Sequence, residues 1–213
     1  MINGVPRSGK TSLALEIMAA SSDHWVNVGV DSVMAETADH FQPGIGLRPG
    51  GERPDLEQLV LISYEHLFSS VAGHLRAGVN VVADVGIHDD YRRPLDIVGV
   101  MRDALADHDV LFVGLHCSLV ALRERRELSG YLTWQPGEPI PDPVVRWQRA
   151  VHRGKAYDLE LDTTSTSASA CAVTVLSHLR TSGLPDRLTM QHGEEKVQVG
   201  PEVIAIQRKS MLG

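Results

Sequence analysis

Residues 4–11 form the first group whose residue types and spacing suit chemistry. Gly4-Val5-Pro6-Arg7-Ser8-Gly9-Lys10-Thr11 fits the Walker A pattern GxxxxGK[ST] at every position. The glycines let the backbone turn tightly, so that successive N–H groups face phosphate oxygens at the positive end of the following helix. In this motif the positive charge of Lys10 faces the β- and γ-phosphates, and the Thr11 hydroxyl is a magnesium ligand. The motif predicts binding of ATP with Mg²⁺.

The surroundings of this loop favour a phosphate site over the alternative, a glycine-rich turn without a ligand. Met1-Ile2 precede the motif, and an amphipathic helix follows it. The strand before the loop spans only Met1–Asn3, so either this strand is short or the native start lies upstream. The residues of the loop expected to contact the nucleotide are Gly4, Arg7, Ser8, Gly9, Lys10, Thr11 and Ser12.

Two carboxylates end predicted strands. Asp84 closes the apolar run Val81-Val82-Ala83, as in a Walker B strand whose acid holds magnesium; the alternative is a turn aspartate. Asp31 follows the second strand, and the carboxyl ends of parallel strands meet at one edge of the sheet. A carboxylate there can accept the proton of an acceptor hydroxyl, an effect worth about 10²–10⁴-fold in rate. We therefore predict Asp31 as the base, with an N-cap of the helix near Ser32 as the alternative.

Two groups of arginines flank a Gly/Pro-rich segment at residues 129–143. An arginine that reaches the transferring phosphoryl group offsets the charge on its oxygens. The alternative is a solvated ion-pair face, because Glu124 and Glu127 alternate with the first group. Arg123, Arg125 and Arg126 precede the segment, and Arg146, Arg149 and Arg153 follow it.

Strand-like and helical segments alternate along the chain, which predicts an α/β fold: a doubly wound, parallel, five-stranded sheet with helices on both faces. For the helix predicted from Asp55 to about residue 77, Asp55 and Gln58 suit a capping box at its start, and Gly78 suits the residue that ends it. Besides the short first strand, the predicted strands are Trp25–Val30, Val79–Val85, Asp109–Leu115 and, more weakly, Asp158–Asp162. The predicted helices are Gly9–Ala20, one from Asp55 to about residue 77, Leu95–Ala106, Leu119–Leu128, Val144–Arg153 and Ser167–Ser182, which Gly183 ends.

The length of 213 residues predicts one domain, or one domain with an appendage. From the motifs above we expect a P-loop kinase domain over residues 1–183, with a lid at about 123–153, and an extension over 184–213 that adds a strand or docks. A net charge of −7 and a pI near 5.8 disfavour nucleic-acid binding. No apolar run suits a membrane span, and the amino terminus leaves no room for a signal peptide. We therefore expect a reduced cytoplasmic protein.

The histidines and cysteines suggest no further chemistry at this stage. His88, His116 and His152 have no metal-ligand spacing, and Cys117 is expected to be a small buried apolar residue rather than a nucleophile. Trp147 either lines a pocket or packs, and the same holds for Trp134.

From Ile2 to about Leu179 the sequence resembles the chloramphenicol phosphotransferase family, small P-loop kinases related in fold to shikimate, gluconate and adenylate kinases. The segments that carry the resemblance are Asn3-Gly4 with Ser8-Gly9-Lys10-Thr11, Gly29-Val30-Asp31-Ser32, Asp84-Val85, Asp109-Val110-Leu111-Phe112-Val113-Gly114 with Cys117, Arg125, Val151-His152, Tyr157-Asp158 and Leu161-Asp162-Thr163-Thr164.

The resemblance implies ATP-dependent phosphorylation of a hydroxyl on a small antibiotic-like molecule, in resistance or self-protection. It implies that Asp31 is the base, that Lys10 and Arg125 contact phosphate, and that Thr11 with Asp84 serves magnesium. The predicted nucleotide contacts also include Arg123 and Arg126, together with Thr163 and Thr164. The two threonines are expected near the adenine.

This sequence also departs from the family. Ser129-Gly130-Tyr131-Leu132 replaces an Arg-Gly-Asp-Arg-like stretch, and the Phe41–Pro54 loop and the tail beyond Gly183 differ. The identity of the acceptor therefore stays open. Whether the chain forms a homo-oligomer also stays open. A metabolite kinase of the gluconate, shikimate or nucleotide type is an alternative, with acceptor-side cations drawn from Arg48, Arg53, Arg92 and Arg93, as is a non-catalytic nucleotide-binding module.

Overall fold

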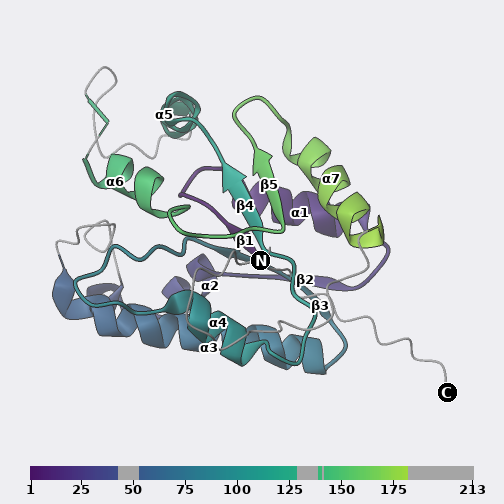
Figure 1. Cartoon of the computed structure of the whole chain (residues 1–213), viewed down its shortest axis with the longest axis horizontal. Helices are drawn as coiled ribbons and strands as arrows, with labels where there is room; N and C mark the ends of the chain where they lie inside the picture. The colour runs from purple at the N-terminus through teal and green to yellow at the C-terminus, as the bar shows by residue number, and fades with distance from the viewer. Residues whose placement is uncertain (43–52, 129–138, 141, 182–213) are drawn as a thin grey trace, which may run out of the picture.

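A parallel five-stranded sheet forms the centre of the computed structural model, which describes residues 1–42, 53–128, 139–140 and 142–181 (Figure 1). The order across the sheet is β2-β3-β1-β4-β5, so the strand before the Walker A loop lies in the middle. All four strand pairings are parallel, which confirms the predicted sheet. The strands are β1 (Ile2–Asn3), β2 (Trp25–Gly29), β3 (Asn80–Val85), β4 (Val113–His116) and β5 (Leu159–Asp162).

Helices cover both faces of this sheet (Figure 1). On one face α1 (Lys10–Ala20) packs beside α7 (Ala168–Thr181). On the other, α3 (Glu57–Arg76) packs beside α4 (Ile97–Ala104). The remaining α-helices of the described chain are α2 (Val30–Ala35), α5 (Leu119–Leu128) and α6 (Asp142–Ala150), with short 3₁₀ turns at Asp39–Phe41 and Pro54–Leu56.

Strand β3 shows why the sheet needs cover on both sides. All six of its residues are buried. Val81 and Val85 belong to the core formed with α3 and α4, whereas Val82 belongs to the core formed with α1 and α7. Burying one valine side chain contributes about 1.5–3 kcal/mol to the stability of the fold, relative to leaving that side chain exposed to water. The continuous apolar run therefore fixes β3 in the interior, with Asp84 near its carboxyl end.

The ends of several elements differ from the predictions. The second strand ends at Gly29, and α2 begins at Val30, so Asp31 lies in the first turn of a helix rather than at a strand end. The capping box of Asp55 does not form, because Asp55 lies in a 3₁₀ turn and accepts hydrogen bonds from Arg53. Gly78 follows α3 with a φ of +80°, as predicted for a residue that ends a helix.

The helices around the lid begin and end close to the predicted residues. Helix α5 has the predicted bounds, and α6 begins two residues before Val144, at Asp142. The predicted lid residues 129–138, most of the Phe41–Pro54 loop, Gly183 and the tail lie outside the described residues.

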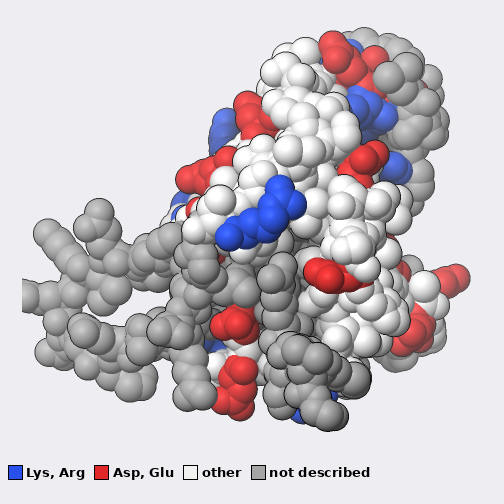
Figure 2. All heavy atoms as spheres, turned by 90° about the vertical axis from the view of Figure 1, so that its right-hand side faces the viewer, with Lys and Arg blue, Asp and Glu red and all other residues white. Residues whose placement is uncertain are grey.

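The described residues show neither a single-sign charged face in Figure 2 nor a helix suited to a membrane. On the face in Figure 2 the basic side chains of described residues are interspersed with acidic ones. Among the described helices, none is both long and apolar enough to cross a membrane.

Candidate active site

The loop at residues 4–11 turns tightly beside β4 and leads into α1. Gly9 has a φ of +97° and precedes the first residue of α1, a conformation that strains residues with a side chain. A Cβ at Gly4 would lie 2.7 Å from the Leu115 carbonyl oxygen, so the loop can approach β4 only with glycine there. Both glycines of the motif are thus required by the backbone, and the N–H groups at the start of α1 are left for a ligand.

Lys10 lies over the loop, close to two carboxylates. Its Nζ donates a hydrogen bond to the Val5 carbonyl oxygen at 3.0 Å. Burial lowers the pKa of Lys10 to about 8, and the charges of Asp84 and Asp31 oppose this shift. The structure therefore brings Lys10, Asp31 and Asp84 into one electrostatic neighbourhood, although they come from three different elements.

Thr11 and Asp84 form a pair of hard oxygen ligands. The Thr11 hydroxyl donates to Asp84 Oδ2 at 2.7 Å, and Asp84 is only 4% exposed. A Cβ at Gly29 would lie 2.3 Å from Asp84 Oδ1, so the neighbouring strand must carry glycine here. This pair fits Mg²⁺, which binds through one or two protein oxygens and completes its shell with phosphate and water. Over residues 1–42, 53–128, 139–140 and 142–181 there is no cluster of three or more His, Cys, Asp or Glu that suits a metal.

Asp31 is exposed, in the first turn of α2. The N-cap position of this helix is Gly29, where no side chain caps the helix. Asp31 is therefore not the N-cap that the alternative required. Its carboxylate is free of a capping role and lies close enough to Lys10 for its charge to raise the pKa of Lys10.

Arg125 joins three segments of the site. Its Nη1 donates to the carbonyl oxygens of Arg7 and Ser8 at 3.3 and 3.2 Å, and its Nη2 donates to the Thr163 carbonyl oxygen. The Thr163 hydroxyl donates to the same Ser8 oxygen at 2.7 Å. The structure thus brings together the loop, the α5 arginine and the segment after β5.

The other predicted nucleotide contacts differ in their surroundings. Arg123 pairs with Glu127 at 2.9 Å along α5, as the alternative of an ion-pair face predicts, whereas Arg126 is buried. The Thr164 hydroxyl accepts from Ser118 N at 2.9 Å. Ser12 is exposed in the first turn of α1.

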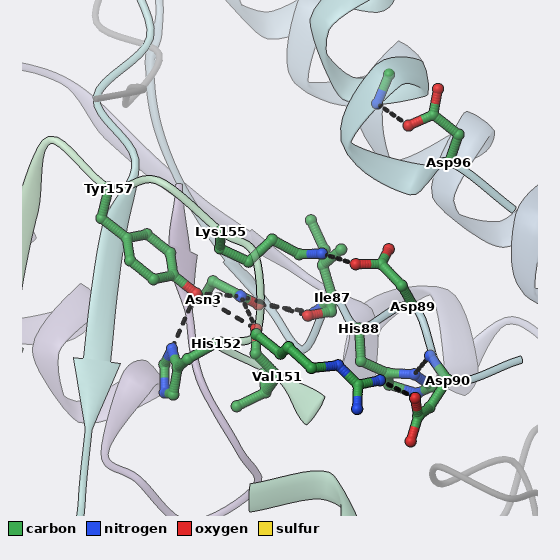
Figure 3. Close-up of polar contacts among 12 residues, drawn as sticks. Asn3, Ile87, His88, Asp89, Asp90, Asp96, Val151, His152, Lys155 and Tyr157 are labelled. Carbon is green, nitrogen blue, oxygen red and sulfur yellow. Dashed lines mark hydrogen bonds and ion pairs between the residues drawn. The ribbon is translucent and has the colours of Figure 1, made fainter. Parts of the chain in front are cut away.

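A second polar group, around Asn3, was not recognised as a site in the sequence (Figure 3). Asn3 is fully buried and contacts Ile87, Val151 and Tyr157, and Tyr157 in turn contacts His152. Asn3, Val151, His152 and Tyr157 all lie in segments that carry the family resemblance, but no spacing connects them. Only the central place of β1 brings Asn3 against a segment 148 residues further on.

The segments after β3 and after α6 are joined by ion pairs (Figure 3). Asp89 pairs with Lys155, and Asp90 pairs with Arg153. Arg153, predicted to belong to the arginines that flank the lid, thus has a carboxylate partner, while Arg146 and Arg149 are exposed on α6.

Trp147 packs on Gly86 and against the ring of His88. Cys117 is 2% exposed and burial raises its pKa, so it is the buried apolar residue expected.

Comparison with known proteins gives a family and a fold. The family model described as "Chloramphenicol phosphotransferase-like protein" matches residues 1–180. Two Mycobacterium tuberculosis relatives, from strains CDC 1551 and H37Rv and each named "Putative O-phosphotransferase", are 24% identical over 180 residues, covering 78% of this chain and 75% of theirs.

Solved structures with the same arrangement include two kinases. A sugar kinase from Janibacter sp. HTCC2649 superposes with a TM-score of 0.58 at 17% identity, covering 84% of this chain and 92% of that one. The Mycobacterium tuberculosis APS kinase, solved with AMPPNP and APS, gives 0.57 at 18% identity, covering 84% and 95%. The likeness at this identity concerns the fold, which is that of the P-loop kinases.

Proposed function

The chain belongs to the chloramphenicol phosphotransferase-like family, and from this premise we propose that it transfers the γ-phosphate of ATP to a hydroxyl of a small, neutral, antibiotic-like molecule. The observation that carries the proposal is the meeting of Lys10, Asp31 and the Thr11–Asp84 pair at one edge of the sheet. Phosphoryl transfer needs positioned charges and an aligned acceptor more than covalent help from the protein. These residues supply the charges, and the Asp31 carboxylate is available to an acceptor hydroxyl.

Each residue then has a role that follows from its chemistry. Lys10 and the N–H groups at the start of α1 bind the phosphates. Thr11 and Asp84 hold Mg²⁺, which neutralises charge on the phosphate oxygens when bound. Asp31, exposed and not engaged as a cap, accepts the proton of the acceptor hydroxyl.

Arg125 and the threonines after β5 form the nucleotide side of the proposed site. Arg125 is held against the loop by the carbonyl oxygens of Arg7 and Ser8 and by Thr163. Its guanidinium charge lies beside the loop that receives the phosphates, where it offsets their negative charge. Thr163 and Thr164 connect this arginine to the carboxyl ends of β4 and β5, the edge expected to receive the base of the nucleotide.

A neutral acceptor is proposed partly on three ion pairs: Arg53, one of the candidate acceptor-side cations, and two cations of the segment after α6 already have carboxylate partners. Arg53 donates to both carboxylate oxygens of Asp55. Lys155 pairs with Asp89, and Arg153 pairs with Asp90. A gluconate- or nucleotide-type acceptor would have to compete with these carboxylates. Arg92 and Arg93 are exposed and stay candidates for an anionic acceptor, so both classes of acceptor belong in the screen.

An acceptor screen with the full chain tests this proposal. The chain would be incubated with ATP and Mg²⁺ and, in parallel, with neutral hydroxyl-bearing antibiotics including chloramphenicol, and with gluconate, shikimate and nucleoside monophosphates. Mass spectrometry is expected to detect one added phosphate on a neutral compound, formed about 10²–10⁴-fold more slowly with Asp31→Asn. Phosphorylation of anionic compounds alone would contradict the neutral acceptor, and nucleotide binding without transfer to any compound would contradict the enzyme.

A further inference from the structure

The orientation of the Asn3 amide is fixed by a backbone group. Ile87 N–H donates to Asn3 Oδ1 at 2.7 Å, and an N–H has no acceptor function, so the oxygen of this amide must face Ile87 N. Asn3 Nδ2 therefore faces Tyr157 and Val151, and it donates to the Tyr157 hydroxyl at 2.8 Å and to the Val151 carbonyl oxygen at 3.1 Å. The Tyr157 oxygen is thus an acceptor toward Asn3.

The Tyr157 proton then settles the tautomer of His152. The hydroxyl lies 2.8 Å from His152 Nδ1 and 3.4 Å from the Val151 carbonyl oxygen. An O–H···O contact of 3.4 Å is long for a hydrogen bond, so we assign the Tyr157 proton to the 2.8 Å contact, which leaves Nδ1 unprotonated. A neutral imidazole carries one proton, which must be on Nε2. Figure 3 shows this chain of contacts from Asn3 to His152.

Burial and two neighbouring groups keep His152 neutral. Burial lowers its pKa to about 4, and the nearby charges of His116 and Lys10 act in the same direction. The His116 ring lies against the His152 ring, with centroids 4.0 Å apart, and His116 Nε2 is itself engaged by Glu160 at 2.7 Å. His116 therefore covers one face of the His152 ring, and Tyr157 engages its Nδ1 edge.

His152 Nε2 has no hydrogen-bond partner among the described residues, although the atom is buried. The residue as a whole is only half-buried. A buried N–H without a partner is rare in proteins and calls for one. His116, whose ring packs on that of His152, is joined to the phosphate loop, because the Thr163 hydroxyl lies within hydrogen-bond distance of both the His116 and the Ser8 carbonyl oxygens.

We propose that the chain Asn3–Tyr157–His152 is a built donor of the active site, which presents the Nε2–H of His152 to a phosphate oxygen of the ligand bound by Lys10. The inference rests on the proposed function, since it requires a triphosphate at the loop. His152 contacts the ligand directly, whereas Asn3 and Tyr157 are positioning residues that act through it. The same β1 strand that leads into the phosphate loop thus also orients a donor from the far side of the lid.

Nuclear magnetic resonance of the full chain with ¹⁵N-labelled histidine tests the tautomer. Before ligand is added, His152 is expected to be protonated on Nε2 alone at pH 7. Tyr157→Phe keeps the ring that packs against Phe112 but removes the hydroxyl, so it is expected to give a mixture of tautomers. A proton on Nδ1 in the unaltered protein would overturn the proposal.

Titration with ligands tests the contact to phosphate. Tripolyphosphate, AMPPNP and ADP are the probes, and adenosine is the control without phosphate. The Nε2 resonance is expected to move with tripolyphosphate and AMPPNP but not with adenosine. A response to ADP as well assigns the contact to the β-phosphate, and no response to ADP assigns it to the γ-phosphate. No response to any phosphate probe would overturn the proposal.

Two substitutions of His152 separate a ligand contact from a packing role. His152→Gln places an amide N–H near the position of Nε2, whereas His152→Asn places one near Nδ1. We expect His152→Asn to weaken tripolyphosphate binding by about tenfold or more, because a hydrogen bond to a charged group is lost, and His152→Gln to restore most of it. Equal affinities for the two variants, with both folded, would overturn the inference.

The outcomes distinguish this inference from the proposed function. A chain that binds tripolyphosphate through His152 but transfers phosphate to no acceptor contradicts the function and leaves the contact standing. A chain that transfers phosphate normally with His152→Asn contradicts the contact and leaves the function standing.

Discussion

The Thr11 hydroxyl donates a 2.7 Å hydrogen bond to Oδ2 of Asp84, a residue 73 positions further along the chain. This contact joins the first turn of α1 to the carboxyl end of β3, and it is possible only because Gly29 on β2 leaves room for the carboxylate. We expect the same two oxygens to be the protein ligands of Mg²⁺ in the working enzyme.

Asp84→Asn is predicted to weaken the affinity for magnesium. The amide still accepts a hydrogen bond from Thr11 but carries no charge, so the Mg²⁺ concentration for half-maximal transfer should rise about ten- to a hundredfold. Steady-state rates over a magnesium series measure this, and Thr11→Ser, which keeps the hydroxyl, is the matched control. An unchanged magnesium dependence in Asp84→Asn would remove Asp84 from the metal site.

Lys10 is predicted to make nucleotide affinity depend on pH. Its pKa in the free protein is about 8, and a bound phosphate stabilises the charged form. Affinity for AMPPNP should therefore be constant below pH 8 and fall above it, by at most about tenfold per pH unit.

Calorimetric titrations between pH 6.5 and 9.5 measure this affinity. Lys10→Ala should bind AMPPNP weakly at every pH and transfer no phosphate. Lys10→Arg stays charged, so its affinity should not fall near pH 8. Retention of full transfer activity by Lys10→Ala would refute the phosphate-loop assignment.

Asp31→Asn should slow transfer by about 10²–10⁴-fold, because a general base is lost. Affinity for AMPPNP should change little, since the predicted role of Asp31 is toward the acceptor. Ser32→Ala, at the next exposed position of α2, is the control. Single-turnover rates and AMPPNP titrations together separate the two effects; a loss of only twofold would argue against a base.

Arg125→Lys should lower transfer by about two orders of magnitude, because one ammonium group cannot contact the carbonyl oxygens of Arg7, Ser8 and Thr163 together. Arg180→Ala, on the distant end of α7, removes an exposed arginine that contacts Ser177 and serves as the control. If Arg125→Lys transfers phosphate as fast as the control, Arg125 has no role in the reaction.

Truncation after Gly183 should leave a folded domain that binds nucleotide. Helix α7 ends at Thr181, and its buried residues, of which Val175 is the last, lie within the retained part. Size-exclusion chromatography and AMPPNP titration of the fragment measure this. An insoluble fragment would mean that the tail contributes to the core or to an oligomer interface.

The sequence by itself determined the elements whose pattern is local. The run Gly4–Thr11, the apolar stretch before Asp84 and the glycine at position 78 each specify a backbone state within a few residues, and the structure has the loop, the buried strand and the helix end there. Alternation of strands and helices then limits the fold to a parallel sheet.

Only the tertiary structure decided which distant side chains meet. It placed Asp31 inside a helix rather than at a strand end, gave Arg125 its partners at Ser8 and Thr163, and joined Asn3 to Tyr157. These contacts depend on strand order and on a few ångströms of helix placement. Packing of the whole core sets both, and no spacing along the chain encodes them.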